Sequence, residues 1–309
     1  MTRENTLNIA MVLLMILFPL WAWITDEPFM ITLATKAAIL ALAGIGLNIA
    51  LGLGGLVSLG HATFFGIGGY AMGILASHAQ TYVPIMEAPF LIEGTKSMPI
   101  IWLTAMAASG LAAFAIGALS LRTSGVYFIM ITLAFGQMLF FFAISWPAYG
   151  GEDGLSIYVR NGFPGMNTLD PIQFYTIAFV LMLVALVFSA KLAKSPFGLA
   201  LNAARQSAER VETIGVSPYR VRLIAFTISG MITGLAGALF ADLNRFVSPT
   251  MLSWQTSGEI MVFVIIGGVA RLFGPVVGAV LFIVLEHLLG GLSEYWHIYL
   301  GRCRRRSKV

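Results

Sequence analysis

Long runs without a charged residue dominate this chain and restrict what it can fold into. Each run is long enough for the roughly 20 residues that an α-helix needs to cross hydrocarbon. Only 10% of the 309 residues are charged, against roughly 25% in an average soluble domain. The runs are continuously apolar and lack the alternation of an outer-membrane barrel, so we expect an all-α, polytopic transmembrane protein. They cover residues 5–25, 37–86, 97–121, 123–151, 171–190 and 223–241.

A glycine-rich sequence interrupts the second run, which is too long for one crossing. Residues 52–61 read GLGGLVSLGH. Glycine at membrane depth permits either close helix contact or an interrupted helix, and the same two readings apply to the GxxxG pairs at 69–73, 230–234 and 274–278. We therefore predict one transmembrane domain over residues 1–309, with about eight to nine spans of ~20 residues and interrupted glycine-rich helices.

The basic residues are distributed unevenly between the connecting segments. Arg3, Arg122 and the segment 191–222 carry eight Lys/Arg on one side, whereas the other side has Lys96, Arg160 and Arg245. Cytoplasmic loops carry an excess of Lys and Arg. We expect a multi-pass protein of the bacterial inner membrane with its N-terminus in the cytoplasm, and the net charge of +4 reflects this orientation in the lipid bilayer rather than binding to nucleic acid.

The largest polar insertion, residues 191–222, is long enough to form a small structure of its own. Ser195-Pro196 and Ser217-Pro218 bracket it, and apolar residues alternate with charged ones in between. This pattern predicts short cytoplasmic helices that end at Gly215. They either lie against anionic headgroups or dock a soluble partner, and the mixed charge favours the partner.

Several polar residues interrupt the spans. Ser58, Gly60 and His61 lie where the second and third spans meet, and they would line a solute path if the helix is broken there. Thr132 and Gln137 lie within the run 123–151. A polar group inside a bundle needs a partner, which is either another helix or water and solute in a path.

No pattern for chemistry is present. The histidines are dispersed, the single cysteine is Cys303, and no HExxH or G-x-S-x-G pattern occurs, so we expect no catalytic residues and no metal site. No lysine follows a glycine, which excludes the phosphate-binding loop G-x-x-x-x-G-K-[ST]. The chain is then not an enzyme and binds no cofactor, and ATP would be used by a partner subunit.

Four segments together resemble the LivM-type permeases of branched-chain amino acid ABC importers. The resemblance runs over residues 35–300, and the segments are LNIALGLGGLVSLGHATFFGIGGYAMGIL from Leu47, LRTSGVYFIMITLAFGQM from Leu121, SPFGLALNAARQSAERVETIGV from Ser195 and IIGGVARLFGPVVGAVL from Ile265. It implies a membrane-spanning subunit that forms half of the translocation path. The partners it implies are a LivH-like second permease, two cytoplasmic ABC ATPase subunits and a periplasmic solute-binding protein.

The resemblance also implies that residues 191–222 are the cytoplasmic coupling loop, which contacts the ATPase through Arg205, Glu209, Glu212 and Gly215. Importers of urea and short amides have permeases with similar segments, so the solute stays open between these classes. An ion-coupled secondary transporter is the other alternative, but it would hold ionisable residues in its core, whereas Lys36, Glu259 and Glu286 are expected near span ends.

The last residues depart from the family pattern. Instead of a final apolar span, residues 302–309 read RCRRRSKV. We interpret this basic tail as a truncated or frame-shifted end.

Overall fold

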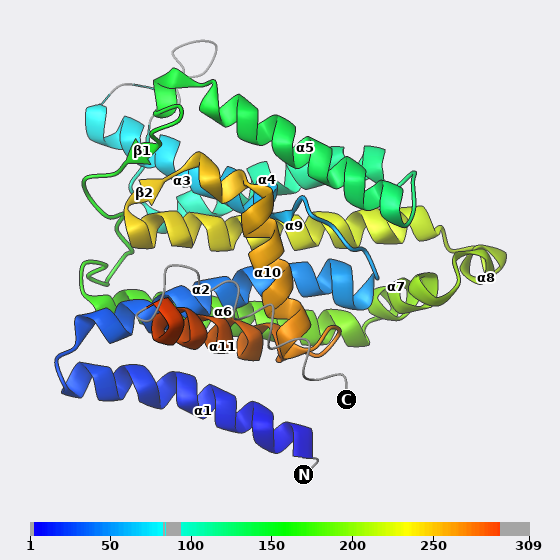
Figure 1. The fold of residues 1–309 in the computed structure, drawn as a ribbon, viewed down its shortest axis with the longest axis horizontal. Coiled ribbons are helices and arrows are strands. Elements are labelled where there is room, and N and C mark those ends of the chain that lie inside the picture. Colours follow the sequence, from blue (N-terminus) through cyan, green and yellow to red (C-terminus); the bar gives the residue numbers. More distant parts are fainter. Residues whose placement is uncertain (1–2, 83, 85–93, 291–309) are drawn as a thin grey trace.

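The computed structural model describes residues 3–82, 84 and 94–290, and helices make up most of this part of the chain (Figure 1). The predicted all-α class is confirmed. The basic tail, residues 302–309, lies outside the described residues. In chain order the elements are α1 (Arg3–Ile24), α2 (Pro28–Asn48), η1 (Ile49–Leu53), α3 (His61–Thr81), α4 (Met98–Ser120), α5 (Val126–Ile144), η2 (Pro147–Tyr149), β1 (Leu155–Ser156), α6 (Pro171–Lys194), α7 (Pro196–Gln206), α8 (Ala208–Thr213), α9 (Pro218–Asn244), β2 (Phe246–Val247), η3 (Pro249–Leu252), α10 (Trp254–Gly267) and α11 (Gly274–Gly290).

Five helices within the described residues are long and apolar enough to cross a membrane. They are Pro28–Leu53, Met98–Ser120, Val126–Ile144, Pro171–Lys194 and Pro218–Asn244, and two shorter apolar helices cover Met11–Ile24 and Gly274–Leu288. The chain is therefore a multi-pass helical membrane protein. The predicted total of about eight to nine spans, at ~20 residues each, stays a prediction.

Proline and short polar residues determine where these helices begin. Proline occupies the first turn of α2, α4, α6, α7 and α9, where its missing N–H has no intrahelical partner to lose. The side chains of Asp170 and Ser253 accept hydrogen bonds from backbone N–H groups in the first turns of α6 and α10. Such N-caps satisfy donors that would otherwise be unpaired.

Glycines allow α3 and α9 to pack at backbone contact in the centre of the molecule. A Cβ on Gly68 would strike the carbonyl of Gly234, and a Cβ on Gly237 would strike the carbonyl of Phe65. Small residues permit this close approach between membrane helices. The packing reading of the glycine pairs is thus correct at 230–234, and likewise at 274–278, where Gly278 meets the carbonyl of Phe263.

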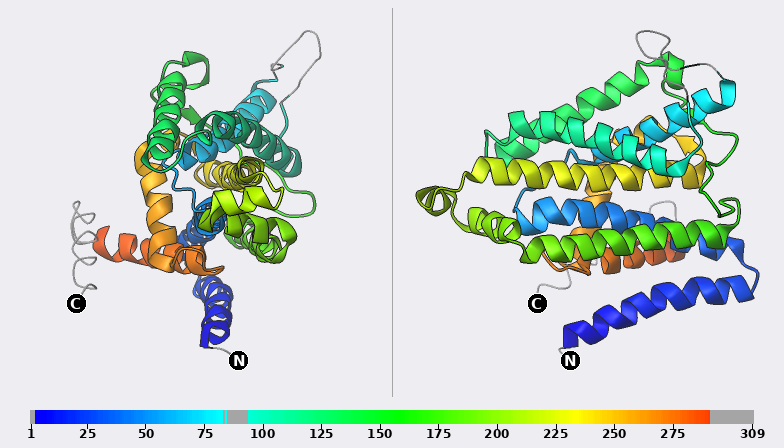
Figure 2. Two further views of the ribbon diagram at one scale, coloured as in Figure 1. Left: turned by 90° about the vertical axis from the view of Figure 1, so that its right-hand side faces the viewer. Right: turned by 180° about the vertical axis from the view of Figure 1, so that it is seen from behind.

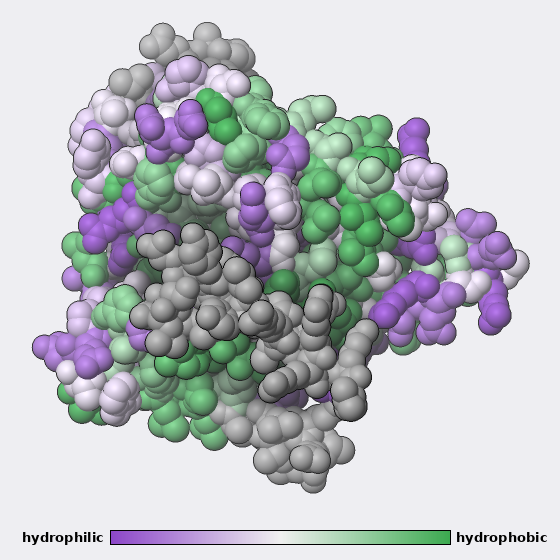
Figure 3. All heavy atoms as spheres, in the orientation of Figure 1, coloured by the Kyte–Doolittle hydropathy of each residue, from purple (hydrophilic) through white to green (hydrophobic). Residues whose placement is uncertain are grey.

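The two ends of the bundle carry different connecting segments. In Figure 1 the α4–α5 turn and the α7–α8 pair lie at the right-hand end, and the loop between α5 and α6 lies at the left-hand end. Figure 2 shows the same arrangement from behind, with α7 and α8 projecting beyond the other helices. In Figure 3 hydrophilic residues gather at both ends, with hydrophobic residues over much of the surface between them.

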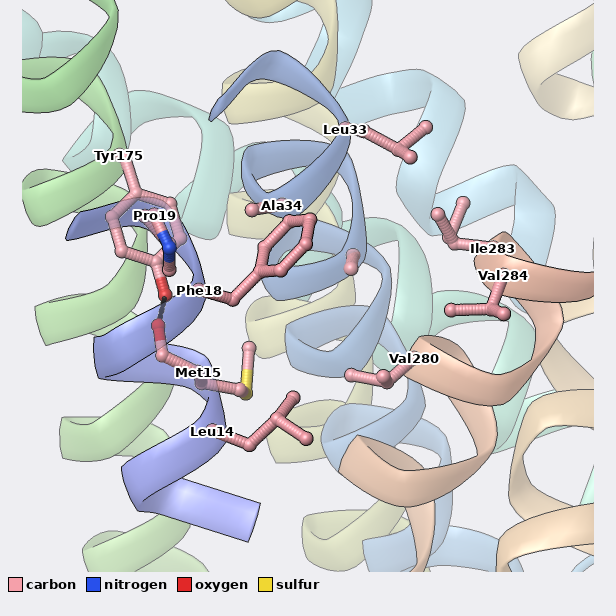
Figure 4. A pocket seen from close by; sticks show the side chains of 11 residues that line it. Leu14, Met15, Phe18, Pro19, Leu33, Ala34, Tyr175, Val280, Ile283 and Val284 are labelled. Carbon is pink, nitrogen blue, oxygen red and sulfur yellow. Dashed lines mark hydrogen bonds between the residues drawn. The ribbon is translucent and has the colours of Figure 1, made fainter. Parts of the chain in front are cut away.

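Helix α1 packs on α2, α6 and α11 around a small apolar pocket of about 90 Å³ (Figure 4). Pro19 lies inside α1 and cannot donate a hydrogen bond to the carbonyl four residues earlier, which belongs to Met15. The buried hydroxyl of Tyr175 in α6 donates to that carbonyl instead. The tyrosine thus supplies the bond that the proline removes.

Helix α10 crosses the other helices rather than running along them (Figure 1). It packs against α2, α3 and α11, and Arg271 lies in the turn that joins it to α11. A short antiparallel pairing of β1 with β2 joins the α5–α6 loop to the end of α9. The guanidinium of Arg160 in that loop donates to the carbonyls of Thr168 and Leu243.

Candidate functional site

The predicted break is present and separates helix α2 from helix α3. Helix α2 widens into the π-helix η1, residues 54–60 are not helical, and α3 begins at His61. In Figure 1 this segment runs back from the right-hand end of α2 to the middle of the bundle, where α3 starts. The N-terminus of α3 therefore lies inside the protein, and its free backbone groups need partners there.

A side chain from α10 pairs with one of these backbone groups, and a side chain from α9 holds the His61 ring. The His61 Nε2 atom lies 2.8 Å from the Ser229 Oγ atom, and Ser229 donates its hydroxyl proton to the carbonyl of Gly46 at 2.6 Å. Because serine has one proton to donate, His61 must donate from Nε2. The N–H of Ala62 donates to the Ser257 Oγ atom at 2.8 Å.

His61 is fully buried among aromatic rings. It makes edge contacts with Phe64 and Phe226, and its Nδ1 atom has no hydrogen-bond partner among the described residues. The ring thus packs in the core and bridges α3 to α9. Contact of His61 with a solute remains a proposal.

Three of the other residues predicted for the path meet at the same point. Ser58 is buried and its hydroxyl accepts from the N–H of Gly60 at 3.2 Å. Gly60 packs on Thr132 of α5, so closely that a Cβ would lie 2.6 Å from the Thr132 carbonyl oxygen. Gln137 lies further along α5 and is half-buried. Its neighbour Gly136 faces the hydroxyl of Thr63.

Asn48 is a site residue that the sequence analysis missed. Its side-chain amide donates to the carbonyl of Arg271 at 3.0 Å, and its Oδ1 atom accepts from the N–H of Ala270 at 3.1 Å. The residue is buried at the end of α2 and fixes the helix end to the α10–α11 turn. An asparagine in an otherwise apolar run was the available signal.

The predicted loop helices are present as α7 and α8. Ser195 and Ser207 cap their first turns, and Gly215 after α8 has a φ of +83°, a conformation that favours glycine. Glu209, Glu212 and Gly215 are all exposed. Beside them the side chains of Leu199 and Ile214 are 63% and 74% exposed, so this end of the protein presents apolar and acidic groups together.

Arg205 is exposed as well, but unlike the other predicted loop residues it directs its guanidinium back to the membrane region. Its guanidinium donates to the carbonyl of Gly52 in η1. Its methylene stem packs on Gly55, where a Cβ would lie 2.9 Å from the Arg205 Cγ atom. The loop therefore contacts the break directly.

A cavity of about 330 Å³ adjoins this contact. It lies between the break, the α4–α5 turn and the loop, and Arg205 and Arg222 line one side. Arg222 donates to the carbonyl of Ala204 at 2.7 Å. Among the described residues no group of three or more His, Cys, Asp or Glu side chains is arranged to hold a metal ion.

Comparison with known proteins covers most of the chain. The family model described as "Branched-chain amino acid transport system / permease component" matches residues 29–301. The high-affinity branched-chain amino acid transport system permease proteins LivM of Escherichia coli (strain K12) and of Salmonella typhimurium are each 29% identical over 303 aligned residues, which cover 89% of this chain and 68% of theirs.

Shorter matches extend to other permeases. The autoinducer 2 import system permease protein LsrC of Photorhabdus laumondii is 30% identical over 34% of this chain and 32% of its own. The probable branched-chain amino acid transport permease protein LivH of Methanocaldococcus jannaschii is 26% identical over 36% of this chain and 35% of its own. No solved structure matches significantly. Since the family model covers nearly the whole described chain, this protein belongs to the permease components of branched-chain amino acid transport systems.

Proposed function

We propose that this chain is the LivM-type subunit of an ATP-driven importer and forms half of the translocation path for branched-chain amino acids. The observation that carries the proposal is the family match over residues 29–301, joined to the exposed loop helices at one end of an apolar bundle. The other half of the path is formed by a LivH-like permease. A periplasmic binding protein delivers the solute, and two ABC ATPase subunits use the ATP.

The path begins where the broken helix exposes polar groups at membrane depth. Ser58, Gly60, His61 and Thr132 meet around the start of α3, and Gln137 lies along the same helix as Thr132. Interrupted helices form solute sites in transporters because their backbone groups and helix ends supply polar contacts without ionised side chains.

The solute class rests on the family rather than on a bound ligand. The LivM relatives, which are named for branched-chain amino acid transport, match most of this chain. The LsrC match covers about a third of it. Branched-chain amino acids are therefore the preferred class, and urea or short amides are the alternative. Calorimetry of the cognate binding protein with each class separates them, because one tight ligand is expected.

We place α7 and α8 at the ATPase and the N-terminus in the cytoplasm. Glu209, Glu212 and Gly215 then contact the ATPase beside the apolar side chains of Leu199 and Ile214. Coupling requires that the inward-open and outward-open states bind ATP and the loaded binding protein with different affinity. A loop held between the ATPase and the membrane helices transmits that difference.

An ion pair accounts for two of the ionisable residues that an ion-coupled secondary transporter could use. Helix α2 begins at Pro28 and Lys36 lies eight residues further on; the expectation that it lies near a span end stays a prediction. Its amino group is 2.9 Å from the carboxylate of Glu286 in α11. The opposite charges satisfy each other and reduce the cost of placing either in a bilayer, which accounts for these residues without ion transport.

Co-expression with the two ATPases and the second permease tests the proposal through Glu212→Arg. We expect the variant to insert normally and to lose ATPase co-purification and ATP-dependent uptake, because an acidic docking contact becomes basic. Glu152→Arg makes the same change on an exposed residue of the α5–α6 loop and should keep ATPase co-purification. Unchanged co-purification and uptake in Glu212→Arg would contradict docking through α8. Absence of any ATPase partner with the unmodified chain would contradict the importer.

A further inference from the structure

We propose that Arg205 is a positioning residue that fastens the coupling loop to the broken segment between α2 and α3, so that movement of the loop moves the break. This inference rests on the proposed importer function. Arg205 is exposed like the residues of α8, but it receives a different role because its guanidinium contacts the Gly52 carbonyl of this chain.

The end of η1 explains why an arginine is needed at this position. The last carbonyls of a helix have no intrahelical donor, and the N–H groups of Gly54, Gly55 and Leu56 donate to Ile49, Leu51 and Ala50. The carbonyl of Gly52 receives its hydrogen bond from the Arg205 guanidinium. A cation is also favoured at the negative end of a helix dipole, so one side chain satisfies the acceptor and the charge.

Apolar packing accompanies the hydrogen bond. Leu201 and Arg205 are four residues apart and share one face of α7. A Cβ on Gly54 would lie 3.4 Å from the Leu201 Cδ1 atom, and one on Gly55 would lie 2.9 Å from the Arg205 Cγ atom. The backbone of Gly55 has a φ of +68°, a conformation that favours glycine. The absence of a side chain on Gly55 also leaves room for the arginine stem.

The residues that follow in the break connect the Arg205 contact to the centre of the bundle. Leu56 is buried in a cluster with Phe64, Phe128 and Phe226, and four residues later Gly60 rests on the carbonyl of Thr132. At its other end the break is held by Asn48, which bonds to the α10–α11 turn. Displacement of α7 would therefore move residues 52–60 relative to the elements that they contact, which are α5, α9 and the α10–α11 turn.

A labelling experiment tests this link in the assembled complex. Val57 is 37% exposed, and Val57→Cys in a Cys303→Ser chain gives a single reactive thiol on the break. We expect its maleimide labelling rate to differ between the ADP-bound and ATP-bound complex. Arg205→Ala should abolish that difference and reduce uptake by about tenfold, within the usual range of coupling between sites, while the ATPases still co-purify. Arg205→Lys should restore part of the nucleotide dependence, because a lysine can still donate to the Gly52 carbonyl.

Arg122→Ala is the matched control because it removes the same charge from an exposed position in the α4–α5 turn, outside the coupling loop. It should leave the labelling difference and the uptake unchanged. Nucleotide-dependent labelling and normal uptake in Arg205→Ala would overturn the proposal, and so would loss of the ATPases from that variant, since Arg205 would then be a docking residue.

The purified chain without partners gives a readout that does not depend on the importer function. There Arg205→Ala should raise the basal labelling rate of Val57→Cys, because the break loses its contact with α7, whereas Arg122→Ala should not. Equal rates would overturn the contact. If the contact is present but the unmodified chain binds no ATPase, the proposed function fails and the structural link stands.

Discussion

Single polar side chains in this protein complete hydrogen bonds that irregular helices leave open. Asn48 accepts from an N–H of the α10–α11 turn, Ser257 accepts from an N–H in the first turn of α3, and Tyr175 donates to the carbonyl of Met15. An unpaired backbone group in a bilayer costs several kcal/mol, so each of these residues acts on stability through the backbone it satisfies. Their side chains are not interchangeable with apolar ones of similar size.

Tyr175→Phe tests this argument at a single atom. The ring stays and the hydroxyl is lost, so the Met15 carbonyl becomes unpaired inside the bundle. We expect the free energy of unfolding in detergent to fall by about 1 to 3 kcal/mol, the cost of a buried unsatisfied acceptor. Tyr127→Phe removes a hydroxyl from a side chain that is 73% exposed. This control should change the free energy of unfolding by less than about 0.5 kcal/mol.

A second substitution separates the backbone effect from simple loss of packing. Pro19→Ala restores an N–H that can donate to the Met15 carbonyl within α1. The loss caused by Tyr175→Phe should therefore be smaller in a Pro19→Ala chain than in the unmodified one, and equal losses in the two backgrounds would exclude the proline as the reason for the tyrosine bond.

At the scale of whole elements, the contact between α3 and α9 depends on the absence of side chains. Gly237→Ala places a methyl group against the carbonyl of Phe65, and backbone cannot rotate away as a side chain would. We expect the two helices to separate and the free energy of unfolding to fall by about 1 to 3 kcal/mol, measured by thermal or denaturant unfolding in detergent.

Gly258→Ala in α10 is the matched control because a Cβ there meets nothing within 4 Å. Alanine also has the higher helix propensity, by about 1 kcal/mol. The control should therefore be neutral or slightly stabilising, and an equal loss in both variants would show that glycine content rather than helix contact determines stability.

The sequence predicted elements better than it predicted contacts between them. The helix break at residues 52–61 and the loop helices after Ser195 follow from local signals, because glycine runs and Ser-Pro pairs act on the backbone nearby. The inward direction of Arg205 depends on Gly52, which is 153 positions away in the chain. The pairing of Lys36 with Glu286 spans 250 positions. Such partners are determined by how the helices pack, which a single sequence does not state.

For the whole molecule, the structure places the predicted basic segments at one end. The α4–α5 turn, which contains Arg122, and the α7–α8 pair of the segment 191–222 lie at the right-hand end in Figure 1, and α1 starts from the right-hand side of its own length. Arg160 and Arg245 lie at the opposite end near the β1–β2 pairing. The charge asymmetry that was counted along the sequence is thus an asymmetry of the folded protein, and the excess of Lys and Arg should orient it with α7 and α8 in the cytoplasm.

Cysteine accessibility in intact cells tests this orientation without changing the charge of either end. In a Cys303→Ser chain, Tyr158→Cys and Asn202→Cys each place one thiol at an exposed position, in the α5–α6 loop and on α7 respectively. A maleimide that passes the outer membrane but not the inner one should label Tyr158→Cys in intact cells, because that loop would face the periplasm. It should label Asn202→Cys only after the inner membrane is permeabilised. The reverse pattern would place α7 and α8 in the periplasm, out of reach of any ATPase, and would exclude the coupling role of the loop together with the positive-inside assignment.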